Sequence, residues 1–474
     1  MRLIPIYTWN KTLIQFGNRR RMLANQPWTQ GVILLVCVIV AMLLANLPWT
    51  REFYFEFLET DVAIDVHHPN GTGFTFPRGM TIEKFINDIL MVVFFFAVGL
   101  EIKREIVCGE LSTPKKAVMP VIAALGGVLA PALIYALVNH GTAASSGWGI
   151  PTATDIAFAV GILSVLGDKV PISLKVFLTA LAIADDLMAI LVVAIFYGGH
   201  LNLGLLAIAL VLVMLIILMN QMGEKRPWFY MIPAVAVWIL FYYSGIHATM
   251  SGVVMAFLIP MTPRYSKHYY FRKRKIYRAQ LNELDRIHEP GGFPNGHQRQ
   301  ILWQLSNTSK DCIGLSYRLE HALGPWVNFV IMPIFALANA GVWIADPSYF
   351  NVLHFSPELG GVSMGIFLGL LIGKPLGITL ASFLAVKARV AAMPEGASWK
   401  MLLAVACLGG IGFTMSIFVD TLSFGDQPEQ VMMLLRNMGK VAVLLGSLCS
   451  AILGSVLVMV FAKKKSATVS NSAD

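Results

Sequence analysis

The sequence is poor in charged residues. Only 13% of its 474 residues are Asp, Glu, Lys or Arg, whereas 56% are hydrophobic. Soluble domains average about 25% charged residues, so this composition excludes an ordinary soluble enzyme or a string of soluble domains. It predicts a polytopic membrane protein that forms one membrane domain over residues 1–474.

Cysteines and acidic residues are also scarce. The 5 cysteines are scattered with no C-x-x-C pair, and this argues against a disulfide framework or a zinc site. Asp and Glu number 27 against 36 Lys and Arg, a net charge of +9. In a membrane protein this excess belongs on cytoplasmic loops, so it indicates no nucleic-acid partner. We expect no cofactor.

Long apolar runs predict an all-α fold with about 12 transmembrane helices. The first, 31–48, has a signal peptide as its alternative, but it is too long and lacks a convincing cleavage site. The later runs lie at about 85–100, 117–138, 149–166, 171–197, 203–218, 228–243, 246–259, 326–342, 362–386, 401–419 and 441–461. Connections after even-numbered spans hold Lys or Arg, and Arg19–Arg21 precede the first span. Both termini are therefore predicted to be cytoplasmic.

Two polar segments interrupt these runs. Residues 51–79 alternate β-branched and aromatic residues around a Pro-Asn-Gly-Thr-Gly turn, which predicts a periplasmic β-hairpin. Residues 261–324 hold 11 Lys or Arg against 5 Asp or Glu and are expected to be a long basic cytoplasmic loop. Its basic part is either an interfacial helix that touches anionic lipid or a solvated, mobile loop.

Ionisable residues lie inside the apolar runs, where each is costly. Asp155 lies in the fourth span, Asp185 and Asp186 are adjacent in the middle of the fifth, and Lys374 lies near the middle of the tenth. A lysine at that depth needs a counter-ion or must lose its proton. The three aspartates are the candidates, and we expect them to form an ion site with Lys374.

Two spans carry helix breaks. The fourth contains Pro151-Thr152-Ala153-Thr154-Asp155, and the eleventh contains Gly409, Gly410 and Gly412 within four residues. If the breaks cross, Asp155 offsets the positive half-helix ends and Lys374 the negative ones. Oxygen ligands such as Asp155, Thr154 and the aspartate pair suit a small hard cation. Because protons compete for the same carboxylates, the pattern predicts a cation/proton antiporter.

Several longer motifs resemble the bacterial NhaA Na+/H+ antiporters, in the same order along nearly the whole chain. They are Asn87-Asp88, VGLEIKRE, TDIAFAVGIL, ALAIADDLMAI, SGIHAT, RLEHAL, LANAGV, GKPLGI and GGIGFTMSIF. The resemblance implies inverted repeats with two crossed discontinuous helices, in spans 4 and 11. It also implies a homodimer made partly through residues 51–79, in the bacterial inner membrane.

The resemblance further implies roles for individual residues. Asp186 would be the principal cation ligand, and Asp185 would pair with Lys374 when no ion is bound. Transport of Na+ or Li+ would exchange two protons in for one Na+ out and serve Na+ and pH homeostasis. Activation at alkaline pH would involve a charged cluster made of Glu101, Arg104, Glu105, Glu320 and His321.

Two other classes of protein share parts of this pattern. An intramembrane aspartyl protease would need its acids on two facing spans, and Lys374 would have no role in it. We therefore expect no enzyme activity. A Na+-coupled organic-anion symporter also uses crossed broken helices. The adjacent aspartates with a membrane lysine favour proton exchange over that alternative.

Overall fold

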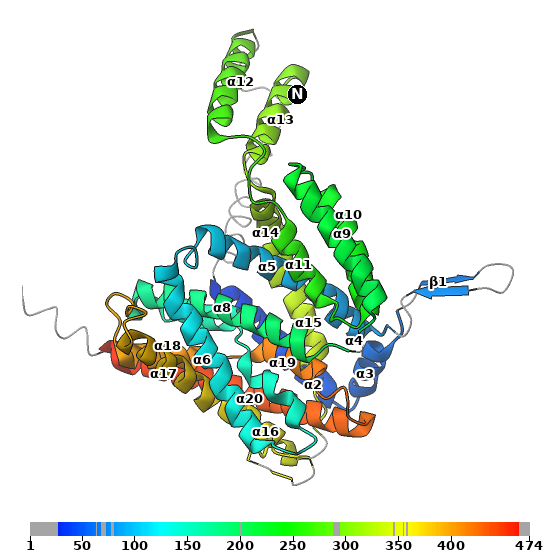
Figure 1. Cartoon of the computed structure of the whole chain (residues 1–474), viewed down its shortest axis with the longest axis vertical. Helices are drawn as coiled ribbons and strands as arrows, with labels where there is room; N and C mark the ends of the chain where they lie inside the picture. The colour runs from blue at the N-terminus through cyan, green and yellow to red at the C-terminus, as the bar shows by residue number, and fades with distance from the viewer. Residues whose placement is uncertain are drawn as a thin grey trace, which may run out of the picture. The chain divides into compact units, whose positions relative to one another are not determined.

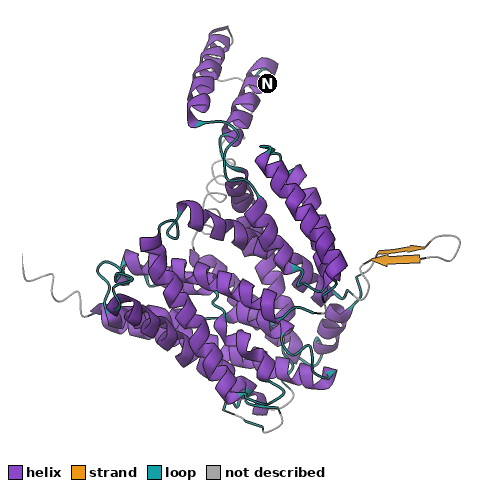
Figure 2. Cartoon of the chain, viewed as in Figure 1, coloured by secondary structure: helices purple, strands orange, loops and turns teal. Residues whose placement is uncertain are grey.

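The structure is a computed structural model. It describes residues 27–62, 64–67, 73–76, 80–199, 201–287, 294–344, 347–353, 355–356 and 359–463. These residues are almost entirely helical, with two short strands (Figure 2). The arginines at 19–21 and the turn expected at 69–72 lie outside them.

The described residues fall into two compact units. The larger is drawn from Met1–Met91, Glu105–Gly198 and Asn328–Asp474, and the smaller from Val92–Arg104 and Gly199–Val327. The smaller unit holds most of α5 (Met91–Cys108), together with α9 (Leu203–Gln221), α10 (Trp228–Ser244), α11 (Thr249–Leu258), α12 (Lys267–Ile287), α13 (Gly296–Asp311) and α14 (Leu315–Trp326) (Figure 1).

The larger unit contains the remaining elements. Its N-terminal part is made of α2 (Pro27–Asn46), α3 (Arg51–Glu59), β1 (Ile64–His67), β2 (Gly73–Phe76), α4 (Ile82–Phe85), η1 (Ile86–Leu90), α6 (Pro114–Val138), η2 (Ser145–Thr152), α7 (Ile156–Val165), η3 (Gly167–Lys169) and α8 (Ile172–Phe196). Its C-terminal part is made of η4 (Val327–Ile331), which begins at the unit boundary, α15 (Met332–Asn339), η5 (Pro347–Phe350), α16 (Val362–Leu368), η6 (Gly369–Gly373), α17 (Lys374–Lys387), α18 (Trp399–Gly409), α19 (Phe413–Leu422) and α20 (Glu429–Lys463).

Within the described residues, 9 helices are long and apolar enough to cross a membrane, and the bent pair α18–α19 makes a tenth. Two shorter apolar helices, Trp228–Ser244 and Thr249–Leu258, occupy the positions of the seventh and eighth predicted spans. Ten spans are thus supported by length and composition. A total of 12 stays a prediction that depends on these two short helices.

The segment 51–79 differs in part from the predicted hairpin. Strands β1 and β2 pair antiparallel, with Ile64 opposite Phe76 and His67 opposite Gly73. The aromatic stretch before them is not a strand, because Arg51–Glu59 form helix α3. Tyr54 explains the difference: its hydroxyl donates to Leu337 O at 2.6 Å, and the side chain is buried. Here a tertiary contact overrides the alternating pattern.

The long polar segment 261–324 is not an irregular loop. It contains the two amphipathic helices α12 and α13 and most of α14. Asn295 begins α13 with a capping box, in which its side chain accepts from Gln298 N and the Gln298 side chain accepts from Asn295 N, each at 2.8 Å. The predicted ninth span accordingly begins earlier than expected, at Leu315.

Helices α6 and α17 cross where Gly126 of one helix faces Gly377 of the other. A Cβ at Gly377 would lie 2.1 Å from Gly126 O, and a Cβ at Gly126 would lie 2.3 Å from Gly377 O. Small residues allow this close approach of two membrane helices. Because Gly377 is one turn beyond Lys374, the crossing fixes the helix that carries the lysine.

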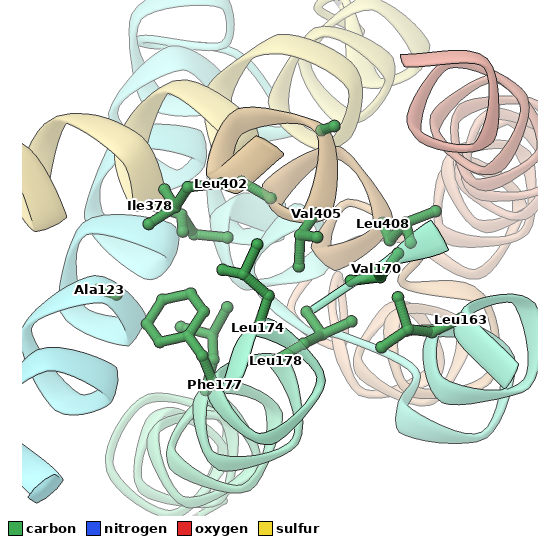
Figure 3. Close-up of a cluster of buried hydrophobic side chains, with 14 of the residues drawn as sticks. Ala123, Leu163, Val170, Leu174, Phe177, Leu178, Ile378, Leu402, Val405 and Leu408 are labelled. Carbon is green, nitrogen blue, oxygen red and sulfur yellow. The ribbon is translucent and has the colours of Figure 1, made fainter. Parts of the chain in front are cut away.

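A buried apolar cluster lies between helices of the larger unit. Figure 3 shows side chains from α6, α7, α8, α17 and α18 that point toward one another. They include Ala123, Leu163, Leu174, Phe177, Leu178, Ile378, Leu402, Val405 and Leu408, joined by Val170 from the turn between η3 and α8. This packing holds α8, with its two aspartates, against the elements that carry Lys374 and the glycine break.

Candidate ion-binding site

Lys374 and Asp185 form a buried ion pair. Lys374 Nζ lies 2.7 Å from Asp185 Oδ2, and the two side chains are 1% and 2% exposed. The same ammonium donates to Thr152 O at 2.5 Å. Helix α17 begins at Lys374, directly after the π-helical turn η6. Such wide turns recur at functional sites, since they turn one side chain out of the regular α-helical register.

Asp185 and Asp186 are both buried on α8. Their side chains point about 100° apart, because an α-helix has 3.6 residues per turn. Asp185 Oδ1 accepts no hydrogen bond from any residue that the structure describes. The lysine therefore satisfies one oxygen of Asp185 and leaves the other available to a further partner.

The fourth predicted span is broken in its middle. Helix η2 ends at Thr152, residues 153–155 are extended, and α7 begins at Ile156. Pro151 lies in the last turn of η2, and Asp155 caps α7 by accepting from Phe158 N at 3.3 Å. A carboxylate at an N-cap is favoured because it accepts from unpaired backbone N–H groups and faces the positive end of the helix dipole.

The eleventh span is broken at the glycines, with an angle of 47° between α18 and α19. The two breaks contact each other. Asp155 N donates to Ile411 O at 2.6 Å, and the Thr414 backbone N–H donates to Asp155 Oδ2 at 3.1 Å. The Thr414 hydroxyl donates to the same oxygen. Asp155 thus accepts hydrogen bonds from the first turns of both α7 and α19.

Other predicted residues complete this contact. The Thr154 hydroxyl donates to Gly409 O at 2.9 Å, so it satisfies the C-terminal end of α18. A Cβ at Gly410 would lie 2.4 Å from Leu370 O, and one at Gly412 would lie 2.8 Å from Ala153 O. The break therefore requires glycine at positions where other backbones approach closely.

Members of the predicted charged cluster lie on α5 and α14. In the smaller unit, Arg104 Nε lies 3.1 Å from Glu320 Oε1, and Arg104 Nη2 lies 3.8 Å from Glu101 Oε1. The His321 ring stacks on Tyr317, with centroids 5.2 Å apart. Glu105, in the larger unit, accepts from Glu110 N at 2.9 Å. Arg104 therefore pairs with both Glu101 and Glu320, whereas His321 stacks on a tyrosine and Glu105 accepts from a backbone N–H.

Sequence reasoning missed two groups that hold the site. The carbonyl of Thr152 accepts from Lys374, and a backbone oxygen leaves no signal in a sequence. Thr414 donates to Asp155 through both its backbone and its side chain. Its position just after the glycine break was the available signal, because the first residues of a half-helix carry unpaired N–H groups.

Known proteins match the chain over nearly its whole length. Residues 21–458 match the family described as Na+/H+ antiporter 1. The chain belongs to this family. Its relatives include the Na(+)/H(+) antiporter NhaA of Wolinella succinogenes, 42% identical over 459 residues that cover 95% of this chain and 96% of the relative. The Na(+)/H(+) antiporter NhaA of Helicobacter pylori strain P12 is 40% identical over 438 residues, 92% of this chain and 93% of the relative.

A third relative is the Na(+)/H(+) antiporter NhaA 2 of Syntrophotalea carbinolica, 39% identical over 424 residues that cover 90% of this chain and 92% of the relative. As a member of the Na+/H+ antiporter 1 family with many apolar helices, the chain is a multi-pass membrane protein. The expected family is confirmed.

The arrangement has a defined chemical capacity. Two adjacent carboxylates can bind either a small cation or protons, and a neighbouring ammonium can take the place of the cation. Buried carboxylates next to an ammonium titrate as a coupled set rather than one by one. Cation binding at such a site releases protons, and protonation releases the cation.

Proposed function

We propose that this protein exchanges Na+ or Li+ for protons across the bacterial inner membrane, with both termini in the cytoplasm. Asp186 is the principal cation ligand, and Asp185 alternates between the cation, a proton and Lys374. One observation carries the proposal: the 2.7 Å pair of Lys374 Nζ with Asp185 Oδ2 inside the membrane domain, next to a second carboxylate. Membership of the family supports the choice of ions.

The ion pair represents the cation-free state. When Na+ enters from the cytoplasm it replaces the ammonium at Asp185, and two protons leave the site, one from the Asp186 carboxyl group and one from the freed ammonium of Lys374. When the site opens to the other side, protons displace Na+ and the pair with Lys374 forms again. Exchange of two protons inward for one Na+ outward moves one net charge, so the membrane potential drives export.

Asp155 and Lys374 compensate the partial charges at the ends of the broken helices during this cycle. Asp155 accepts hydrogen bonds from the N-terminal turns of α7 and α19, while Lys374 donates to the last carbonyl of η2. These contacts support crossed discontinuous helices within inverted repeats. Neutralised half-helix ends allow the two halves to move without exposing uncompensated partial charges to lipid.

Alkaline activation is assigned to the charged cluster that includes Arg104, Glu320 and His321. What supports this is the ion pair of Arg104 with Glu320, beside a histidine on the same helix as Glu320.

Two further assignments concern partners. The chain forms a homodimer through the β1–β2 pair, because an isolated two-stranded sheet is marginally stable and leaves edges to pair.

Helix α12 contacts anionic lipid through a row of exposed basic side chains, which are Lys267, Arg272, Arg274, Lys275 and Arg278.

The function is tested by proton flux in everted membrane vesicles on addition of Na+ or Li+, between about pH 6.5 and 9. We expect cation-dependent alkalinisation of the lumen that increases with pH. Asp186→Asn should abolish it. Asp426→Asn, a matched change of an exposed aspartate, should not. Na+-driven uptake of a labelled organic anion without proton movement would instead establish the symporter.

A further inference from the structure

A further buried carboxylate, that of Asp420, lies outside the ion site described above. Asp420 is near the C-terminal end of α19, and its side chain is 0% exposed. Neither of its oxygens accepts a hydrogen bond from any residue that the structure describes. A buried carboxylate without hydrogen bonds is expensive in its charged form. The ion site uses Asp155 at the other end of the same half-helix and makes no use of Asp420.

Two cationic side chains of α20 face this carboxylate. Arg436 and Lys440 are one helical turn apart, and both interact electrostatically with Asp420. Between them lies Gly439, where a Cβ would be 2.1 Å from Asp420 Oδ1. The carboxylate therefore rests on the bare backbone of α20, against which α19 packs (Figure 1). Arg436 is turned partly away, since its Nη2 donates to Ser423 O at 3.4 Å and it also interacts with Glu83 of α4.

Two tyrosines link Asp420 to the segment that holds Lys374. Tyr135 of α6 and Tyr197 at the end of α8 both interact electrostatically with Asp420. Their hydroxyls also bind the start of η2: Tyr135 donates to Ala144 O, and Tyr197 donates to Ser146 O, each at 2.9 Å. The far end of η2 is Thr152, whose carbonyl accepts from Lys374. Both tyrosines therefore bind the helix whose last carbonyl accepts from Lys374.

We infer that Asp420 is a further proton-binding carboxyl of the transporter, located on α19, the second half of the broken eleventh span. This inference rests on the proposed cation/proton exchange. Burial without hydrogen bonds favours the protonated acid, whereas Arg436 and Lys440 favour the carboxylate. Because these effects oppose each other, Asp420 takes up a proton and gives it up again. The only bond formed or broken is the O–H bond of the carboxyl group. With the proposed cytoplasmic termini, the end of α19 that carries Asp420 faces the non-cytoplasmic side, which suits a group that receives protons before they reach Asp185 and Asp186.

The direct test is infrared difference spectroscopy on the purified full-length protein, titrated between about pH 6.5 and 9. As pH rises, the wild type should lose a carbonyl-stretch band of a protonated carboxyl group in addition to any band of the ion site. This additional band should be missing in Asp420→Asn and lost as in the wild type in the matched control Asp426→Asn. If Asp420→Asn loses the same band, Asp420 is only a structural counter-charge and the inference is wrong.

A second variant keeps the test decisive if Asp420→Asn folds poorly. Lys440→Met removes one cation beside the carboxyl group and leaves the group itself in place. Loss of an opposite charge should let the band persist to higher pH, by on the order of one pH unit. A band that disappears at the same pH in Lys440→Met and the wild type would overturn the assignment.

Transport measurements distinguish a failure of this inference from a failure of the proposed function. In vesicles, Asp420→Asn should reduce the maximal rate of Na+-dependent proton flux on the order of tenfold, with the apparent KM for Na+ changed less than about twofold. An unchanged maximal rate would refute a role in proton delivery. If the wild type itself exchanges no Na+ for protons, the proposed function fails, whereas the infrared band of Asp420 still reports on its protonation.

Discussion

At the scale of single residues, the ion site depends on a lysine inside a membrane span. Lys374 needs a counter-ion at that depth, and this need was predictable from its position in about 25 apolar residues. The choice among three aspartates was not predictable from spacing, because it depends on how α8 and α17 are rotated against each other. The lysine pairs with Asp185, whereas Asp155 accepts hydrogen bonds at the two helix breaks.

Replacement of the lysine should destabilise the protein. Lys374→Met leaves the Asp185 carboxylate buried without its cation, and breaking a buried pair costs about 3–5 kcal/mol. We expect a large drop in the thermal unfolding temperature of the purified protein in detergent. Adding Asp185→Asn to Lys374→Met should recover most of that drop.

The exposed Lys387 at the end of α17 provides the control. Lys387→Met should leave the unfolding temperature within about 1 °C of the wild type, since exposed ion pairs contribute little. Equal effects of Lys374→Met and Lys387→Met would mean that the buried pair does not stabilise the fold. No recovery in the double variant would mean that Asp185 is not the main partner.

At the scale of elements, the two broken spans define the site. Each break was visible in the sequence, one as a Pro-Thr-Ala-Thr-Asp string and the other as three glycines within four residues. Their contact could only be hypothesised, because hydrogen bonds such as Thr154 Oγ1 to Gly409 O join residues 255 apart. The aromatic stretch before the hairpin was misassigned for the same reason, since a distant contact of Tyr54 decides its conformation.

The crossing of α6 with α17 predicts the effect of one methyl group. In Gly377→Ala, the new Cβ would lie 2.1 Å from Gly126 O, so the helices must separate. Overpacking of this kind costs about 1–3 kcal/mol, and it moves Lys374 on the same helix. We expect both a lower unfolding temperature and a lower rate of cation-dependent proton flux.

Gly324→Ala is a matched change inside helix α14, where nothing lies within 4 Å of the new Cβ. It should stabilise the helix slightly, by up to about 1 kcal/mol, because alanine has a higher helix propensity. If Gly377→Ala behaved like Gly324→Ala in both measurements, the close glycine crossing would have no part in positioning Lys374.

At the scale of the whole molecule, composition was the most informative property. The low charge content and the spacing of apolar runs predicted a polytopic membrane protein, and the family match and the helix lengths agree. A helix in the basic part of 261–324 was one of two alternatives, and α12 occupies that part. Helix α13 was not predicted, because its apolar residues are few. Its amphipathic pattern was the signal available, and the stretch was assigned to a loop.

Unequal exchange predicts a response to voltage. If two protons enter for each Na+ that leaves, one net charge crosses the membrane, which is worth about 2.3 kcal/mol per 100 mV. In proteoliposomes without a pH gradient, an imposed potential of about 100 mV should drive Na+ toward the positive side until its concentration ratio approaches about 50. Na+ movement that ignores the potential would refute the two-to-one exchange.

Competition of Na+ and protons for Asp185 and Asp186 makes the affinity for Na+ depend on pH, and calorimetric Na+ binding to the purified protein at several pH values measures that dependence. Protonated carboxylates cannot hold the cation, so affinity must rise with pH. With two protons displaced per Na+, the apparent Kd should fall about 100-fold for each pH unit over the range in which both of these protons are bound. Asp186→Asn should abolish binding, while Asp426→Asn should leave the slope unchanged. A Kd that is independent of pH, or Na+ binding of wild-type strength in Asp186→Asn, would contradict the account.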